Sequence, residues 1–239
     1  MKKILIAFLM VAGVLSAMSC ASTKGLSKFG AEMGKKSVPV VGTVRIPYTS
    51  VMSYYGYVKP GAKADAEVNG KKMFYLYVWI PAVAPELGLR MVSPAPEGMT
   101  PAEGDFVGKD WEEGKADKSS FFDTWISWER SAAVLKAEDI VAKGKAGSWL
   151  LFDSNDDSSE MPKNPAGRKY NSLLRIVSDT SDPAKSLIRG LYRIAFTTYK
   201  TGEVKGSFLA QVGAPINIPG VVVGASLEEV MAKATEASN

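Results

Sequence analysis

The sequence predicts a mainly β protein, an antiparallel sandwich with a few peripheral helices and a helix near its C-terminal end. Many short segments rich in aromatic and β-branched residues are separated by turn signals, and only two or three stretches have helical character. Strands do not alternate with long helices, as they would in a parallel α/β sheet. With 46% apolar and 23% charged residues among 239, the composition is that of an ordinary globular protein.

The first half of the domain contains two strand signals and one long polar stretch. Residues 43–57 are rich in Val, Ile and Tyr and predict a strand or a strand pair, which ends at a Lys-Pro-Gly turn. Residues 73–80 are almost continuously aromatic or β-branched and are closed by Pro81, so we expect a central strand buried on both faces. Residues 85–119, rich in Pro, Gly and acidic side chains, predict a long surface excursion.

The second half contains further strand signals and two helices. The strand-like segments are residues 121–128, 149–152, 170–177, 187–199 and 204–212. The last two are joined by a short turn containing Gly202, which predicts a hairpin. Residues 131–143 fit a short helix. Residues 226–237 predict a C-terminal helix with a capping box of Ser226 and Glu229, whose apolar face is expected to dock on the sheet or on a partner.

The N-terminal end has the layout of a bacterial lipoprotein signal. Two lysines precede an apolar stretch that is shorter than the ~20 residues of a spanning helix, and small residues lead up to Cys20. We therefore expect residues 1–19 to be a cleaved signal peptide and Cys20 to be lipidated; the alternative is an unlipidated signal with a chance cysteine. Residues 20–42 are predicted to be a lipidated tether, and residues 43–239 a single β-sandwich domain, held on a membrane through the N-terminal lipid.

Charge and residue inventory exclude several classes of function. The chain has no histidine and one cysteine, which rules out Ser-His-Asp and Cys-His catalysis. Its formal net charge is +4, and removal of the signal takes away two lysines and no acid, which leaves +2. Such a balanced charge does not suggest a nucleic-acid partner, because nucleic-acid binders usually present a dense basic patch.

One dense acidic segment, residues 153–160, carries the only concrete chemistry. Calcium prefers six to eight oxygen ligands, and Asp153, Asn155, Asp156 and Asp157 offer several of them on one loop. The spacing is not that of an EF-hand, because a serine stands where the turning glycine belongs and an asparagine where the bidentate glutamate belongs. The simpler alternative is a solvated acidic turn.

Several aromatic and glycine-containing blocks can be compared with a known family. They are residues 54–61, 75–83, 122–126, 169–173, 189–200 and 202–208. These blocks closely resemble the major surface lipoprotein family of leptospires, and the resemblance extends over about residues 44–224. It implies a jelly-roll β-sandwich on a lipidated N-terminus, displayed at the outer membrane. It also implies a calcium site, adhesin-like binding of extracellular-matrix proteins, and no enzyme activity.

The resemblance also implies particular ligands for the calcium ion. The family's Asp-Thr pair, its adjacent aspartates in the acidic loop and its later tyrosine fall here on Asp123, Thr124, Asp156, Asp157 and Tyr170. Tyr170 would contribute a backbone oxygen. Ala21 and Ser22 follow Cys20 in place of the aspartate that retains many lipoproteins at the inner membrane, and the resemblance to that sorting pattern favours the outer membrane.

Two other classes of function remain open from the sequence. One is a structural envelope lipoprotein without a specific host ligand, whose C-terminal helix packs against a second copy to form a homodimer. The other is a glycan-active enzyme with paired carboxylates, for which Asp123 with Asp156 or Asp157 is the pair that the sequence offers.

Overall fold

The computed structural model describes most of the predicted domain. The described residues are 35–38, 42–45, 48, 50–158, 161, 163, 167–168, 171–200 and 202–237. The predicted signal peptide, the lipidation site Cys20 and the predicted calcium ligand Tyr170 lie outside these residues. β1 (Lys35–Val38) lies in the predicted tether, where no strand was expected, and it pairs antiparallel with β2 (Gly42–Arg45), which begins at the last residue of that tether.

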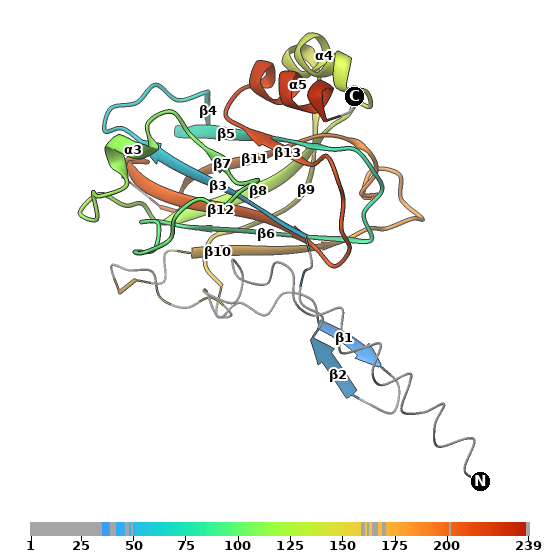
Figure 1. Ribbon diagram of the computed structural model, residues 1–239, viewed down its shortest axis with the longest axis horizontal. Coiled ribbons are helices and arrows are strands. Elements are labelled where there is room, and N and C mark those ends of the chain that lie inside the picture. Colours follow the sequence, from blue (N-terminus) through green and yellow to red (C-terminus); the bar gives the residue numbers. More distant parts are fainter. Residues whose placement is uncertain are drawn as a thin grey trace.

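Two β-sheets pack face to face and form a sandwich (Figure 1). The five-stranded sheet has the order β10 (Asn171–Val177), β6 (Glu86–Val92), β12 (Gly206–Ala214), β3 (Ser50–Val58) and β7 (Phe106–Val107). The six-stranded sheet has the order β13 (Val222–Gly224), β5 (Lys71–Ile80), β11 (Gly190–Thr198), β8 (Thr124–Ser131) and β9 (Trp149–Asn155), with β4 (Ala66–Val68) also paired to β5. All pairings are antiparallel except the short contact of β3 with β7.

The strand order is that of a jelly roll. Strands β3, β6, β10 and β12 belong to one sheet, whereas β5, β8, β9 and β11 belong to the other, so the chain crosses between the sheets at most steps. This arrangement confirms the mainly β sandwich that the sequence predicts. It also brings the ends of strands that are distant in sequence to the same edges of the sandwich.

The predicted hairpin between residues 187–199 and 204–212 is wrong. Strand β11 pairs with β5 and β8, whereas β12 pairs with β3 and β6, so these two successive strands lie in opposite sheets. Gly202 does turn the chain, with a φ of +113°. A glycine turn between two strands is compatible with either a hairpin or a crossing between sheets, and the local sequence does not distinguish them.

The predicted surface excursion at residues 85–119 is wrong in its first part. Every residue of β6 is buried, and this strand lies inside the five-stranded sheet between β10 and β12. Leu87, Leu89 and Met91 point into the core, while Glu86 and Arg90 alternate with them on the other side. The rest of the excursion contains only β7 and the short helix α3 (Trp111–Gly114).

Apolar side chains from both sheets form the central core. Trp128, Tyr192, Ile194 and Phe196 of the six-stranded sheet meet Leu89 and Phe208 of the other, and all are nearly inaccessible to solvent. The outer face of the six-stranded sheet is covered only in part. There Trp79 is buried, whereas Tyr75 and Tyr77 on the same strand are half-buried, so the expectation of a strand buried along both faces holds for part of β5 only.

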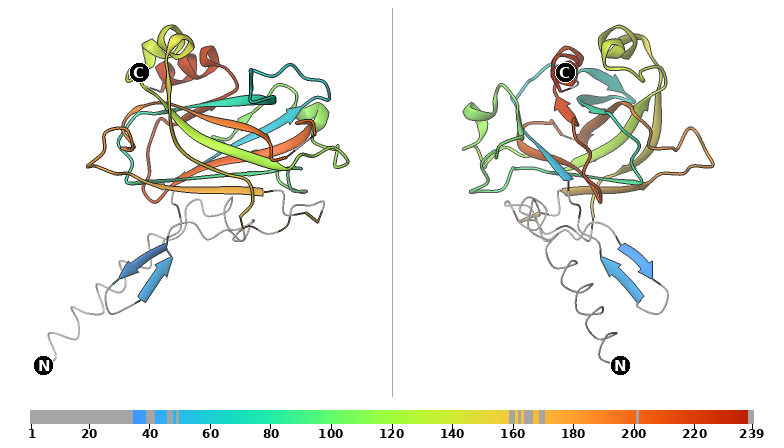
Figure 2. Two further views of the ribbon diagram at one scale, coloured as in Figure 1. Left: turned by 180° about the vertical axis from the view of Figure 1, so that it is seen from behind. Right: turned by 45° about the vertical axis from the view of Figure 1, so that its right-hand side comes forward.

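Two helices cover that outer face on the same side of the sandwich (Figure 2). The predicted helix at residues 131–143 is displaced toward the C-terminus, as a short 3-10 helix at Ala137–Asp139 followed by α4 (Ile140–Ala146). The predicted C-terminal helix is confirmed as α5 (Leu227–Glu236). Its buried residues Leu227 and Val230 pack against β13, β5 and α4, so its apolar face docks on the chain's own domain.

The predicted capping box of α5 is present. Ser226 Oγ accepts a hydrogen bond from Glu229 N at 3.1 Å, and Glu229 Oε2 accepts one from Ala225 N at 2.8 Å.

We expect Ser226→Ala to lower the free energy of unfolding by about 1 kcal/mol, because it leaves a helix N–H without its acceptor. Urea denaturation measures this, with Ser226→Asn as the control that keeps a capping oxygen. An equal loss in both variants would contradict the capping role.

Candidate calcium site

The predicted metal ligands come from neighbouring strand ends. Asp123 directly precedes β8 and Thr124 begins it, while Asp156 and Asp157 follow the last residue of β9. Strands β8 and β9 run antiparallel, with Ile126 opposite Asn155, so the start of one lies beside the end of the other. The fold therefore brings the Asp-Thr pair next to the acidic loop, although more than 30 residues of chain separate them.

Ser172 of β10 ties these two segments together. Its hydroxyl oxygen lies within hydrogen-bond distance of the backbone carbonyls of Thr124, at 2.7 Å, and of Asp156, which share its one proton, and 2.7 Å from Thr124 Oγ1. On the other side of the loop, Ser158 N donates to Asn171 O at 3.2 Å. Because Ser172 and Thr124 are fully buried, these contacts fix the backbone beneath the carboxylates.

Asp123 is the least satisfied group of the site. Its backbone carbonyl accepts a hydrogen bond from Tyr199 N at 2.9 Å, but its side-chain Oδ1 is buried and has no hydrogen-bond partner among the described residues. The side-chain oxygen of Asn155, at the end of β9, is likewise buried and has no hydrogen-bond partner among the described residues. Buried oxygens normally have a partner, and two of them beside one loop suit the oxygen chemistry of a hard cation.

Burial and electrostatic repulsion act in the same direction on the pKa of Asp123. Burial raises the pKa of this carboxyl above its ordinary value, and the negative charges of Asp157 and Asp156 raise it further, while Lys200 opposes the effect. The structure therefore places the three predicted aspartates within electrostatic range of one another. Three carboxylates in such a position favour either a proton or a cation.

The raised pKa of Asp123 predicts how the stability of the protein depends on pH when calcium is removed. Because the folded-state pKa of Asp123 is raised, the native protein holds the proton more tightly than the unfolded chain, and stability falls as pH rises through that window. We expect Asp123→Asn to raise the urea midpoint at neutral pH in the presence of a chelator, and to flatten the pH dependence. The exposed Asp153→Asn variant is the matched control and should have little effect on either property. A lower midpoint for Asp123→Asn would contradict the assigned repulsion.

The structure does not assemble a complete set of metal ligands from the residues it describes. Among them, no three acidic, histidine or cysteine side chains converge on one point. The Thr124 hydroxyl is engaged with Ser172, and Tyr170 is not described. The structure thus places Asp123 within electrostatic range of Asp156 and Asp157 without closing the three carboxylates around one point, and the roles of all five predicted ligands stay predictions.

Two residues near the site, Ser172 and Lys200, were not predicted from the sequence. Ser172 supports the loop from 16 residues beyond Asp156 and 48 residues beyond Thr124, and Lys200 supplies an opposing positive charge. Ser172 is one of many serines in the sequence and Lys200 one of many lysines. Only the assembled jelly roll distinguishes them from the others.

A family model matches most of the chain. Residues 42–223 match the model of the Lipl32 family, which is described as surface lipoprotein of the Spirochaetales order. The chain belongs to this family of spirochaete surface lipoproteins. The match spans both sheets and the acidic loop, and it confirms the resemblance to the leptospiral lipoproteins. A comparison with curated individual proteins gave no match.

Family membership supports a location at the cell surface and a lipoprotein character. Of the helices that the structure describes, none combines the length and the hydrophobicity needed to span a bilayer.

Proposed function

We propose that this surface lipoprotein binds calcium at the loop between β9 and β10, and that it acts at the outer membrane as an adhesin-like module for extracellular-matrix proteins. The observation that carries the calcium proposal is the buried, unpartnered Oδ1 of Asp123 beside two further aspartates. The fold is a rigid sandwich that presents loops at its edges, which suits a binding role. Family membership likewise favours binding over catalysis.

Carboxylate oxygens of Asp123, Asp156 and Asp157 would hold the ion, together with the backbone oxygen of Tyr170 and the oxygens of Thr124. Bound calcium would supply positive charge to a cluster whose members otherwise repel one another. Ser172 holds the backbones of Thr124 and Asp156 next to each other, so closing the site around an ion would mainly require movement of the carboxylate side chains. Calcium would thereby link the beginning of β8 to the end of β9.

Calcium titration during thermal unfolding tests this site. Preferential binding to the folded state should add RT ln(1 + [L]/Kd), which is about 2.7 kcal/mol when calcium is a hundredfold above its dissociation constant. We expect Asp156→Ala/Asp157→Ala to lose this increment and to keep its β-rich circular dichroism. Glu97→Ala/Glu103→Ala, which removes two exposed acids elsewhere, is the matched control and should keep the increment. No shift in the wild type, or an equal shift in the aspartate double variant, would remove the calcium site.

Two experiments on cells test the location. Cys20→Ser should yield a protein that no longer incorporates radioactive fatty acid and no longer partitions into detergent. Protease added to intact cells should digest the wild-type protein, because surface display leaves the whole domain outside the outer membrane. Protection in intact cells, with digestion only after lysis, would contradict surface display.

Binding to immobilised collagen and fibronectin tests the adhesin role separately. We expect saturable binding by the calcium-loaded wild type and weaker binding by Asp156→Ala/Asp157→Ala, since this variant lacks two of the proposed calcium ligands. Calcium-dependent stability without any matrix binding would retain the metal site and favour the structural envelope role instead.

A further inference from the structure

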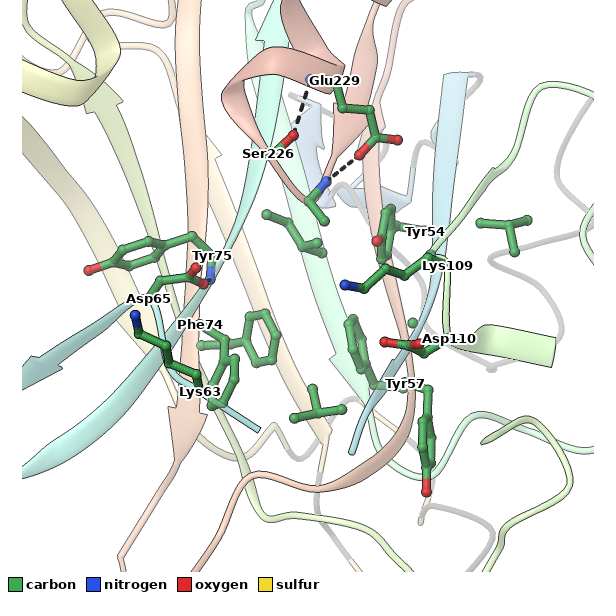
Figure 3. A pocket seen from close by; sticks show the side chains of 18 residues that line it. Tyr54, Tyr57, Lys63, Asp65, Phe74, Tyr75, Lys109, Asp110, Ser226 and Glu229 are labelled. Atoms are coloured by element: carbon green, nitrogen blue, oxygen red, sulfur yellow. Dashed lines mark hydrogen bonds between the residues drawn. The ribbon is translucent and has the colours of Figure 1, made fainter. Parts of the chain in front are cut away.

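A second candidate site, which shares no residue with the acidic loop, is a cavity lined by strands of both sheets. The cavity has a volume of about 560 Å³ and is shown in Figure 3. Its walls come from β3 and β7 of one sheet, from β5 and β11 of the other, and from the start of α5. Pockets that bind small molecules in proteins usually measure roughly 300–1,000 Å³, so this cavity has a suitable size.

Aromatic rings form its inner wall. Tyr54 and Phe208 lie with their ring centroids 6.1 Å apart, and Phe74 and Phe196 lie 5.7 Å apart, both in stacked arrangements. Gly56 lets the ring of Phe208 pack directly against the backbone of β3, because a Cβ there would overlap that ring. The wall thus offers an apolar surface to the apolar part of a ligand, although its four rings pack against one another and none is more than 9% exposed.

Charged side chains surround the opening, and two of its carboxylates already have counter-ions. Asp110 Oδ1 is 3.1 Å from Lys59 Nζ, and Glu229 Oε1 accepts a hydrogen bond from Lys233 Nζ at 2.6 Å. These two acids are therefore neutralised by lysines that do not line the cavity.

The opening has one further carboxylate, on Asp65, and two lysines, Lys63 and Lys109. Asp65 accepts a hydrogen bond from Tyr75 N at 2.8 Å, and partial burial raises its pKa. Lys63 and Lys109 have no ion pair or side-chain hydrogen bond with any described residue, and both are exposed at the mouth. Figure 3 shows Lys63 beside Asp65 on one side of the cavity and Lys109 on the opposite side.

We propose that this cavity binds an amphipathic organic anion, with its apolar body against the aromatic wall and its carboxylate, sulfonate or phosphate between Lys63 and Lys109. The acids at the rim repel an anion less than their number suggests, because Asp110 and Glu229 are already paired with lysines, and only Asp65 is left to attract a cation. The two lysines, in contrast, offer an anion two uncommitted donors. Hydrogen bonds between charged partners are stronger than neutral ones, so the anionic group determines selectivity.

A pair of fluorescent probes with the same aromatic body tests this proposal. Anilinonaphthalene sulfonate carries an anionic group, and phenylnaphthylamine does not. Both become fluorescent in apolar surroundings, so each can be titrated with the full mature protein. We expect the sulfonate to bind more tightly than the neutral probe, and decanoate to displace it.

Three variants locate the binding and assign its charge dependence. Lys63→Gln/Lys109→Gln should weaken sulfonate binding about tenfold, as expected for loss of charged hydrogen bonds, and change the neutral probe little. Lys185→Gln, an exposed lysine on another loop, should change neither. Val107→Trp should block both probes, because Val107 lines the cavity and is 42% exposed, so a larger side chain can occupy the opening without disturbing the core.

Equal loss of both probes in the lysine double variant, or no loss of the sulfonate, would overturn the anion assignment. Unchanged binding in a folded Val107→Trp protein would overturn the location. Tighter binding of decyltrimethylammonium than of decanoate would show that the site selects cations, and would overturn the proposal as well.

Discussion

Trp128→Ala is expected to lower the free energy of unfolding by about 3–5 kcal/mol, the usual cost of removing a large aromatic side chain from a core. Trp128 lies at the centre of β8, is 1% exposed, and stacks on Tyr192 at a centroid distance of 5.1 Å. Its neighbours are anchored in strands of both sheets, so they cannot collapse fully into the space left behind. Urea denaturation followed by circular dichroism measures the loss.

Trp128→Phe is the control that distinguishes packing from hydrogen bonding. The indole Nε1 is buried and has no hydrogen-bond partner among the described residues, so replacement by phenylalanine loses no hydrogen bond and keeps an aromatic ring on Tyr192. We therefore expect a clearly smaller loss than for alanine. A loss under about 1 kcal/mol for Trp128→Ala would contradict the central position of this ring.

The strands that the sequence predicted correctly share one property, which is that their apolar character is visible without knowledge of the partner strand. The run from Met73 to Ile80 and the segment that became β10 are examples. Strand β6 was missed because Glu86, Gly88 and Arg90 occupy every second position and Pro85 precedes them. Their burial depends on what covers the outer face of the sheet, and this is a tertiary property.

The pairing of strands could not be predicted from turns. The segments that became β11 and β12 are joined by a short glycine-containing turn, yet each joins a different sheet. In a jelly roll many strands pair with strands that are distant in sequence, so a short connection can cross from one sheet to the other. The resemblance to a known family supplied the jelly-roll topology that periodicity alone left undefined.

In the candidate calcium site, too, some residues are recognisable from the local sequence and others only from the assembled fold. Asp156 and Asp157 stand out in an acidic run, whereas Asp123 was assigned through the family resemblance. Ser172, which supports both segments, carries no local signal, and the cavity near Lys63 and Lys109 draws its walls from both sheets. Such sites become visible only when the register of each strand is known.

Gly206→Ala is expected to destabilise the protein by about 3 kcal/mol or more, for two separate reasons. Gly206 begins β12 with a φ of +103°, a conformation that costs a residue with a Cβ about 1–3 kcal/mol. A Cβ at this position would also overlap the backbone carbonyl of Ser120, which cannot move as a flexible side chain could. Relieving this overlap should add about 1–3 kcal/mol, as overpacking of a core does.

Gly202→Ala separates these two contributions. Gly202 has a similar φ of +113°, but a Cβ there would meet no atom within 4 Å. We expect this variant to show the conformational cost alone, about 1–3 kcal/mol, and to be clearly more stable than Gly206→Ala in urea. Equal losses in the two variants would mean that the approach of Ser120 to the start of β12 contributes nothing, whereas a larger loss at Gly206 assigns the difference to that backbone contact.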